Sequence, residues 1–374
     1  KQLGEAIDFI TSLDSPTILG NLGGPGQLFL IRLRQQHGLE THRVPFHALK
    51  ALLGDAVVGA DVQTRTEMLI AAFTQAPYIY YEMRELDLDI FFAREYARAR
   101  LAVQEHRKRA QLQYMAAERD LMLALGLAYE PSKAREIFSN PGMIAGAKED
   151  EKRLEAQITS CLRRIEIYDL LRNHPELPQV KGLGPALGGG LIGEILDIRR
   201  FATPQQLRAY ARYTQGRFGG IPRRKKGEVA NWSDKLHRPV WFWSTDQVPR
   251  YDHLWREVYR LYKLEELRAH PEVEIKEVQD SQGRDRKVRT FTLGHLNRRA
   301  QRRIGSTLLE YIHGLWWAQV TGADPVAWYQ ASKWPVFFAD TQASLASGGA
   351  QDLQRLIDAR KGEPTDEADD DASE

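Results

Sequence analysis

The chain has only one cysteine, Cys161, among its 374 residues. A single thiol excludes an internal disulfide framework and a multi-thiolate metal site, and fits a reducing cytoplasm. No apolar run approaches the roughly 20 residues that cross a bilayer, so we expect no membrane partner. The first residue is Lys1 rather than Met and no signal sequence follows, so we expect part of the natural protein to precede it.

The net charge is also small, at +2, but it is unevenly distributed. The stretch 199–303 contains 25 Lys and Arg against 12 Asp and Glu, whereas the tail 362–374 carries seven acids and no base. Ordinary solvated helix faces are the alternative, but they would spread the charge more evenly. A basic block in a weakly acidic chain is typical of a polyanion partner.

The pattern of apolar residues and breakers predicts a mainly α protein with a small α/β part at its start. We expect a strand at Thr17–Leu19, a loop at Gly20–Gly26, a helix at Leu28–His37 and a strand at Glu40–Val44. All eight Trp lie beyond residue 231, which indicates a separate C-terminal domain. The expected regions are 1–85 (α/β), 86–174 (helical hairpin), 175–342 (helical domain) and 343–374 (small-residue loop, short helix and acidic disordered tail).

Two long charged helices are predicted in the middle region, at 86–127 and 148–173. Apolar residues of the second step by four and three, as in a coiled-coil seam: Leu154, Ile158, Cys161, Ile165 and Tyr168. The helices form either an antiparallel hairpin or a dimerising coiled coil. We expect a homodimer or a higher oligomer through this element.

A glycine hairpin follows, with Val180-Lys181-Gly182-Leu183-Gly184 leading into a helix at Pro185–Leu196. Glycine permits a positive φ and a close approach of backbone to phosphate, and a helix N-terminus attracts anions. Lys181, Gly182 and Gly184 are therefore candidate phosphate contacts. A nucleotide-binding loop would follow a strand, and a Walker loop needs Gly-Lys-Ser/Thr, which is missing. A purely structural turn is the remaining alternative.

The basic block contains a glycine-rich segment, residues 216–228, with five positive charges. It is either a solvated loop or an arm along a phosphate backbone. Trp232, Trp241, Phe242 and Trp243 follow, and at helical spacing they are core residues more readily than base-stacking platforms. The candidate nucleic-acid contacts in this block are Arg199, Arg200, Arg217, Arg223, Arg224, Lys225, Lys226, Arg298, Arg299, Arg302 and Arg303.

These motifs together resemble a known family. The hairpin, Asp197 to Thr203, Tyr210-Ala211 and Gly219 to Trp232 follow one another as in the C-terminal domain of insertion-sequence transposases of the DEDD, RuvC-like class. The better-known members are guided by a bridging RNA. The resemblance covers about 177–246 and 297–322, and more weakly the upstream part. It implies a divergent member with a degenerate RuvC-like N-terminal part, a coiled coil and a helix–hairpin–helix domain, and DNA with a guide RNA as partners.

Family members cut DNA with four metal-binding acids and a nucleophilic serine, so the resemblance implies Mg²⁺ as the cofactor. The closest counterparts in this chain are Glu67, Asp61 and Ser233, while Ile70 occupies the position of the fourth acid. Asp55 or Asp87 supplies an acid if the alignment shifts by a few residues. The sequence therefore lacks a complete set of the four acids and the serine, and it does not identify the metal ligands.

Three hypotheses remain open at this point. The first is a nucleoid-associated transposase acting in DNA transposition and recombination. The second is a domesticated, non-catalytic protein that binds DNA or guide RNA. The third is a structural adaptor for an acidic protein partner.

Overall fold

The computed structural model describes residues 9–14, 16–21, 27–57, 59–84, 86–126, 141–214, 232–251, 253–279 and 285–360. The chain divides into two compact units. The first comprises Lys1–Glu166 and Ile192–Arg200, and the second comprises Ile167–Leu191 and Phe201–Glu374. The boundary therefore passes through a helix, and the units are treated separately below.

A three-stranded sheet organises the start of the first unit. Its order is β1 (Thr17–Asn21), β2 (Glu40–Val44) and β3 (Tyr81–Glu82), with β1 and β2 parallel and β2 and β3 antiparallel. The parallel pair is joined by helix α2 (Gln27–His37), as a parallel connection requires. The other elements of this part are α3 (Phe46–Leu53), η1 (Gly54–Val57), α4 (Val62–Gln75) and η2 (Pro77–Ile79).

Two small apolar cores hold these elements together. One contains Val44, Leu49 and Tyr80 and joins β2, α3 and the segment before β3. The other contains Leu30 and Phe91 and fixes α2 against the start of the next helix. The predicted helix at 28–37 and strand at 40–44 are confirmed, and the first strand extends two residues beyond its predicted end.

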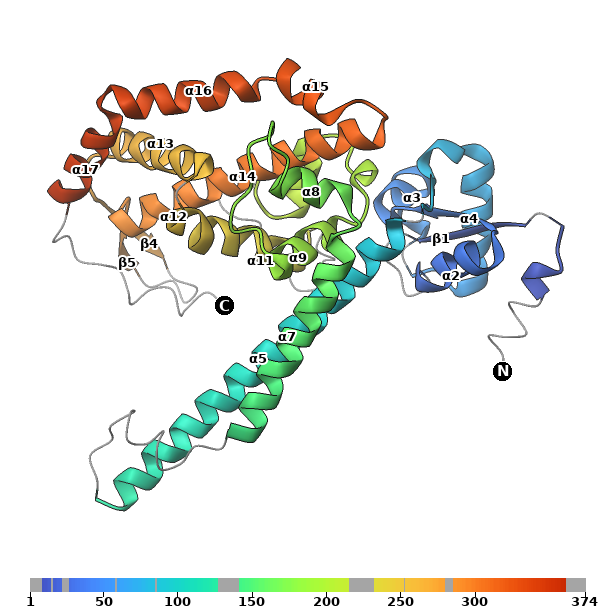
Figure 1. Cartoon of the computed structure of the whole chain (residues 1–374), viewed down its shortest axis with the longest axis horizontal. Coiled ribbons are helices and arrows are strands. Elements are labelled where there is room, and N and C mark those ends of the chain that lie inside the picture. Colours follow the sequence, from blue (N-terminus) through green and yellow to red (C-terminus); the bar gives the residue numbers. More distant parts are fainter. Residues whose placement is uncertain are drawn as a thin grey trace. The chain divides into compact units, whose positions relative to one another are not determined.

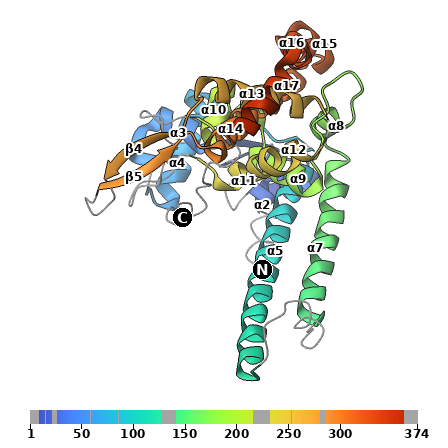
Figure 2. The ribbon, with the colours of Figure 1, turned by 90° about the vertical axis from the view of Figure 1, so that its left-hand side faces the viewer.

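Helices α5 (Leu86–Ala124) and α7 (Pro141–Leu162) lie side by side in both views (Figures 1 and 2). Two ion pairs cross between them, Arg100 with Glu155 and Arg107 with Glu151, and Arg164, just after α7, pairs with Asp89 of α5. As the residue number rises along α5 it falls along α7, so the helices are antiparallel. The pairing lies within one chain.

The second long helix is shorter than predicted. It ends at Leu162, and α8 (Glu166–Arg172) begins after a turn. The N–H groups of Arg164 and Ile165 donate to the carbonyls three residues back, which closes the helix as a 3₁₀ turn does. The predicted seam is nonetheless an inward face, because Ile158, Cys161 and Ile165 are all buried.

The second unit is built from helices around the long α14 (Leu293–Val320). Figure 1 shows α13 (Leu254–Ala269) beside it, and α16 (Trp334–Ser344) packs on α13. The other elements with residues in this unit are α8 (Glu166–Arg172, beginning in the first unit), α9 (Pro185–Ile195, ending in the first unit), α10 (Pro204–Tyr210), α11 (Asp234–Phe242), η4 (Trp243–Gln247), α12 (Val248–Arg250), β4 (Glu274–Gln279), β5 (Asp285–Thr290), α15 (Pro325–Ala331), η5 (Leu345–Gly349) and α17 (Ala350–Ala359). The short η3 (Ile198–Arg200) belongs to the first unit.

The described part of the chain is mainly α with a small N-terminal sheet, as predicted, and it has a second small sheet, β4–β5, that was not predicted. The division into units differs from the four predicted regions, since the long helices group with the α/β part. The segment after residue 342 also differs, because Leu353 of α17 packs into a core with Leu264, Leu267 and Leu296. The predicted loop at 343–350 is instead a kinked helical passage whose break is Gly348, at φ +108°. The acidic tail lies outside the described residues.

None of the helices in the described ranges is long and apolar enough to span a membrane.

Candidate nucleic-acid interface

The glycine hairpin forms as predicted, as a tight turn before α9. Val180 and Leu183 are fully buried and anchor the turn. The hydroxyl of Tyr168 donates to the Leu183 carbonyl at 3.1 Å. The indole Nε1 of Trp243 donates to the Lys181 carbonyl at 3.0 Å, which leaves the Lys181 side chain exposed.

The two hairpin glycines have different roles. Gly182 adopts φ +81°, and a Cβ there would lie 2.5 Å from Cβ of Gln247, so both conformation and space require glycine. Gly184 does not take a positive φ, and a Cβ there meets nothing within 4 Å. The backbone at Gly184 is therefore open at the point where α9 begins, and a phosphate can approach it there.

The basic arm, residues 215–231, lies outside the described residues, and with it Arg217, Arg223, Arg224, Lys225 and Lys226. Its two ends are described. The N–H of Ser233 donates to the Tyr210 carbonyl at 2.7 Å, so the residues on either side of this segment lie next to each other. Arg212 pairs with Asp234 at 2.6 Å and lies over the Trp232 ring at 5.5 Å. We call this place the arm base.

Cationic and aromatic side chains surround the arm base. Arg298 and Arg302 of α14 are exposed. The pKa of Arg302 is lowered by partial burial and by the like charges of Arg298, Arg212 and Arg299, against a smaller opposing effect of Tyr213. Mutual repulsion among these guanidiniums is relieved when an anion binds between them.

Aromatic rings line the same place. His237 stacks on Trp241, with centroids 6.1 Å apart, and contacts Tyr213. Burial lowers the pKa of His237, and the hydrogen bond from its Nδ1 to the Ala211 carbonyl only partly opposes this. The aromatics that were predicted to be core divide between two environments: Trp243 is fully buried, whereas Phe242 is 41% exposed beneath Arg238.

One helical segment connects the arm base to the glycine hairpin. It begins with Asp234 at the arm base, passes Pro239 against Gly190 of α9, and reaches Gln247 beside Gly182. The thirteen steps from Asp234 to Gln247, at about 1.5 Å rise each, span about 20 Å. The hairpin and the arm base therefore lie at the two ends of one helical segment in the second unit.

Arg299 and Arg303 differ from the other two arginines predicted on this helix. Arg299 pairs with Glu266 at 2.6 Å, and Arg303 pairs with Glu265 at 2.6 Å and covers the Tyr262 ring. These contacts hold α13 against α14. We therefore assign both a structural role in place of the predicted phosphate contact.

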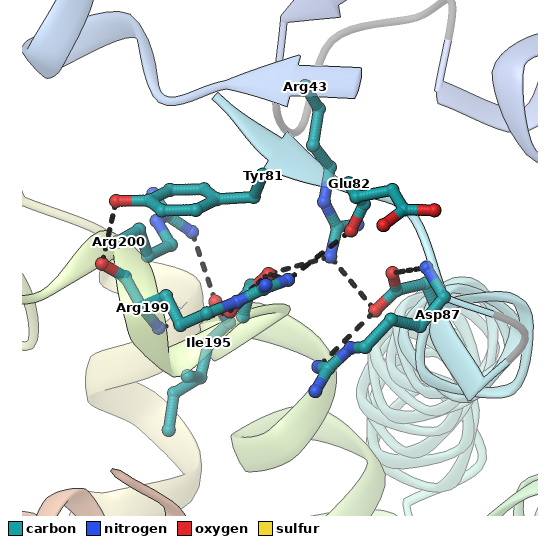
Figure 3. Close-up of polar contacts among 9 residues, drawn as sticks. Arg43, Tyr81, Glu82, Asp87, Ile195, Arg199 and Arg200 are labelled. Atoms are coloured by element: carbon teal, nitrogen blue, oxygen red, sulfur yellow. Dashed lines mark hydrogen bonds and ion pairs between the residues drawn. The ribbon is translucent and has the colours of Figure 1, made fainter. Parts of the chain in front are cut away.

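Arg199 and Arg200 also have partners within the protein (Figure 3). The Arg199 guanidinium donates to both Asp197 carboxylate oxygens, at 3.0 and 2.7 Å, and stacks on Tyr81 at 5.1 Å. Arg200 donates to the carbonyls of Glu194 and Ile195, which end α9. These contacts fasten the end of α9 within the first unit, and the expectation that the two arginines contact nucleic acid stays a prediction.

Arg199 belongs to a buried ionic junction. Arg43 of β2 is 1% exposed and lies between two buried carboxylates, at 2.9 Å from Asp87 and 3.0 Å from Asp197 (Figure 3). Asp87 also accepts from the backbone N–H of Arg84 at 2.6 Å. The junction ties together the central strand, the start of α5 and the segment after α9, which are far apart in sequence.

The junction makes the stability of the first unit depend on pH. Despite the opposing effect of burial, the hydrogen bonds from Arg199 and the charge of Arg43 lower the pKa of Asp197 from 3.8 to about 2. The ionised form therefore stabilises the folded unit by about 2 kcal/mol above pH 4, and this contribution is lost as the pH falls from 4 to 2. We expect urea unfolding followed by circular dichroism to show this loss, and Asp197→Asn to abolish it. An unchanged acid dependence in Asp197→Asn would contradict this assignment.

The three catalytic candidates have structural contacts. Asp61 caps α4, accepting from the Thr64 N–H at 2.9 Å, and Glu67 accepts from Gln63. Ser233 caps α11, accepting from the Leu236 N–H at 3.1 Å.

The two further acids considered from the sequence add no metal ligand to the described part. Asp87 is committed to Arg43, and the side chain of Asp55 lies outside the described residues. Across the described residues, no three His, Cys, Asp or Glu side chains form a group that could hold a metal ion.

Sequence reasoning missed the residues that build the arm base. Arg212 has φ +60°, a conformation that a non-glycine residue rarely adopts, and no sequence signal marks this. Gln247 is recognised as part of this region only from its contact with Gly182, which the sequence does not indicate. Arg43 and Asp87 form a junction with a residue more than a hundred positions away, which periodicity does not indicate.

Comparison with known proteins adds no family assignment. No protein-family model matches the chain, and no curated protein is similar to it. The function is therefore inferred from the residues and geometry above.

Proposed function

We propose that this protein binds the phosphate backbone of DNA through the second unit, as a divergent member of the DEDD, RuvC-like transposases acting in DNA transposition. The observation that carries the binding is the arm base. The described residues on either side of a segment with five positive charges lie together there, and Arg212, Arg298 and Arg302 gather near them beside aromatic rings. Cations with aromatics are the usual means of holding a polyanionic strand.

The glycine hairpin supports the same proposal independently. Its backbone is open at Gly184, the helix behind it presents a positive N-terminal end, and Lys181 is exposed beside it. Together with the arm, it forms two anion-attracting points about 20 Å apart on one helical segment.

The family assignment rests on the order of motifs along the chain. The βαβ arrangement at 17–44, the antiparallel helices and the hairpin follow the order that the resemblance implies. Under this proposal, the α/β part is a degenerate RuvC-like domain and α5 with α7 is the coiled coil. Homodimers, a guide RNA and nucleoid association belong to the same proposal.

The described residues do not fit the metal site of this family. Asp87 already shares Arg43 with Asp197, so a guanidinium balances the buried carboxylates. The proposal therefore assigns no metal ligand and no cutting step. An assay for Mg²⁺-dependent strand exchange on the DNA ends of the mobile element distinguishes an active transposase from a domesticated binding protein. Asp61 and Ser233 serve as helix caps, which favours the domesticated binding protein.

The hairpin proposal predicts opposite behaviour for its two glycines. We expect Gly184→Val to weaken DNA binding about tenfold at 0.1 M salt, as for the loss of one phosphate contact, with no loss of stability. Gly182→Ala should instead cost about 1–3 kcal/mol of stability through its positive φ. Fluorescence anisotropy measures binding, and urea unfolding followed by Trp fluorescence measures stability. Unchanged affinity in Gly184→Val would refute the hairpin as a phosphate contact.

A further inference from the structure

A cleft of about 350 Å³ opens in the second unit, away from the residues assigned so far. One wall is a face of α14 containing Glu310, His313 and Trp317. The opposite side comes from α15 and the start of α16, with Trp328, Lys333 and Trp334. This volume is at the small end of ligand pockets, which suits one planar group rather than a peptide or helix.

The aromatic walls of the cleft are held in place. The His313 ring lies parallel to Trp317 at 5.4 Å, and its Nε2 donates to the Phe201 carbonyl at 2.7 Å. Burial lowers the pKa of His313, so the ring is uncharged at neutral pH. Trp328 lies so close to Gly314 that a Cβ there would be 2.0 Å from its ring. Glycine at this position therefore makes room for the indole.

Charges stand at the rim of the cleft. The Oε1 atom of Glu310 accepts a hydrogen bond from Nζ of Lys333 at 2.5 Å, and Nη1 of Arg208 lies 3.6 Å from Oε2. A carboxylate has about four acceptor positions, so it accepts further donors. Lys333 is 63% exposed and lies over the Trp334 ring at 5.1 Å. The cleft lining thus combines aromatic surface, the Glu310 carboxylate and the Lys333 ammonium, with Arg208 on the far oxygen of Glu310.

We propose that this cleft binds a single unpaired guanine base. The aromatic rings provide a stacking surface. Glu310 accepts from the N1–H and N2–H₂ of guanine, two parallel donors that adenine lacks. Lys333 and Arg208 face the attached phosphate. The inference rests on the proposed function where the base belongs to a DNA or RNA strand, and a free guanine nucleotide is the other source of the same chemistry.

The test compares single-stranded oligonucleotides of ten thymidines in which one central nucleotide is replaced by dG or dA, bound to the full chain. We expect dG to bind at least about fivefold more tightly than dA, the lower end of the discrimination from a bidentate contact. Glu310→Gln should remove this preference, because one of the two guanine donors then meets the amide N–H₂ instead of an acceptor oxygen. The control is Glu265→Gln, which alters a carboxylate paired with Arg303 and should keep the preference.

The variant Lys333→Met and the free nucleotide GMP distinguish failure of the guanine site from failure of the proposed function. Lys333→Met should weaken the dG and dA strands equally. Equal affinity for dG and dA, unaffected by Glu310→Gln, would overturn the guanine site, while salt-sensitive binding of both strands would leave the proposed function intact. Calorimetric binding of GMP that Glu310→Gln abolishes, with no binding of any strand, would support the guanine site and contradict the proposed function.

Discussion

Replacing Arg43 by leucine is expected to lower the free energy of unfolding of the first unit by about 3 kcal/mol. Asp87 and Asp197 would remain buried without the guanidinium that lies between them, and removing one partner of a buried ion pair costs about 3–5 kcal/mol. Asp197 keeps the two hydrogen bonds from Arg199, which places the expected loss at the lower end of that range.

The two units can be followed separately in this experiment. All eight Trp lie in the second unit, so Trp fluorescence reports its unfolding, while far-ultraviolet circular dichroism also reports the first. The matched control is Arg34→Leu, which breaks a partly exposed pair with Glu82 and should cost at most about 1 kcal/mol. If circular dichroism shows the same urea midpoint for Arg43→Leu and Arg34→Leu, the buried junction does not contribute the expected stability to the first unit.

The second large effect is expected from replacing Arg223, Arg224, Lys225 and Lys226 together by alanine. If all four contact phosphates, the slope of log affinity against log salt should fall by about 3.6, and affinity at 0.1 M salt by about three orders of magnitude. The reason is the loss of counterion release, so the decrease should be similar for different DNA sequences. Fluorescence anisotropy with two unrelated duplexes, titrated at several salt concentrations, measures both quantities.

The control for the arm variant removes the same charge elsewhere. Exposed cations on the two long helices are available for this purpose: Arg119, Lys148, Lys152 and Arg153. Replacing these four by alanine should leave the salt slope nearly unchanged, because contact with phosphate, rather than net charge, sets it. Equal losses of affinity in the two variants would mean that the arm acts only through net charge and has no contact of its own.

Local features of the fold were predictable because their signals are local. The helix at 27–37 and the strand at 40–44 follow from apolar periodicity, and Thr203 caps α10 as its sequence indicates. The long helix 86–124 ends before Gly126, which adopts φ +67°. Each of these elements can be predicted from residues that are close to it in the sequence.

Other features depend on contacts between distant residues and could not be predicted in this way. The stripe from Leu154 to Tyr168 predicted one helix, but the turn at 163–165 interrupts it, beside the ion pair of Arg164 with Asp89. Counting charges placed Arg199 and Arg303 among the phosphate contacts, yet each has a carboxylate partner from the fold. Both carboxylates are placed by the fold, and a count of charges along the sequence does not locate them.

The salt dependence of DNA binding by the purified full chain tests the central claim most directly. Affinity for a mixed-sequence duplex should be measured from 50 to 400 mM NaCl. The proposal predicts a straight log–log plot with a steep negative slope, of about 0.9 per phosphate contacted. Absence of binding at 50 mM salt, or an affinity that does not change with salt, would contradict the assignment of this protein as a binder of the DNA backbone.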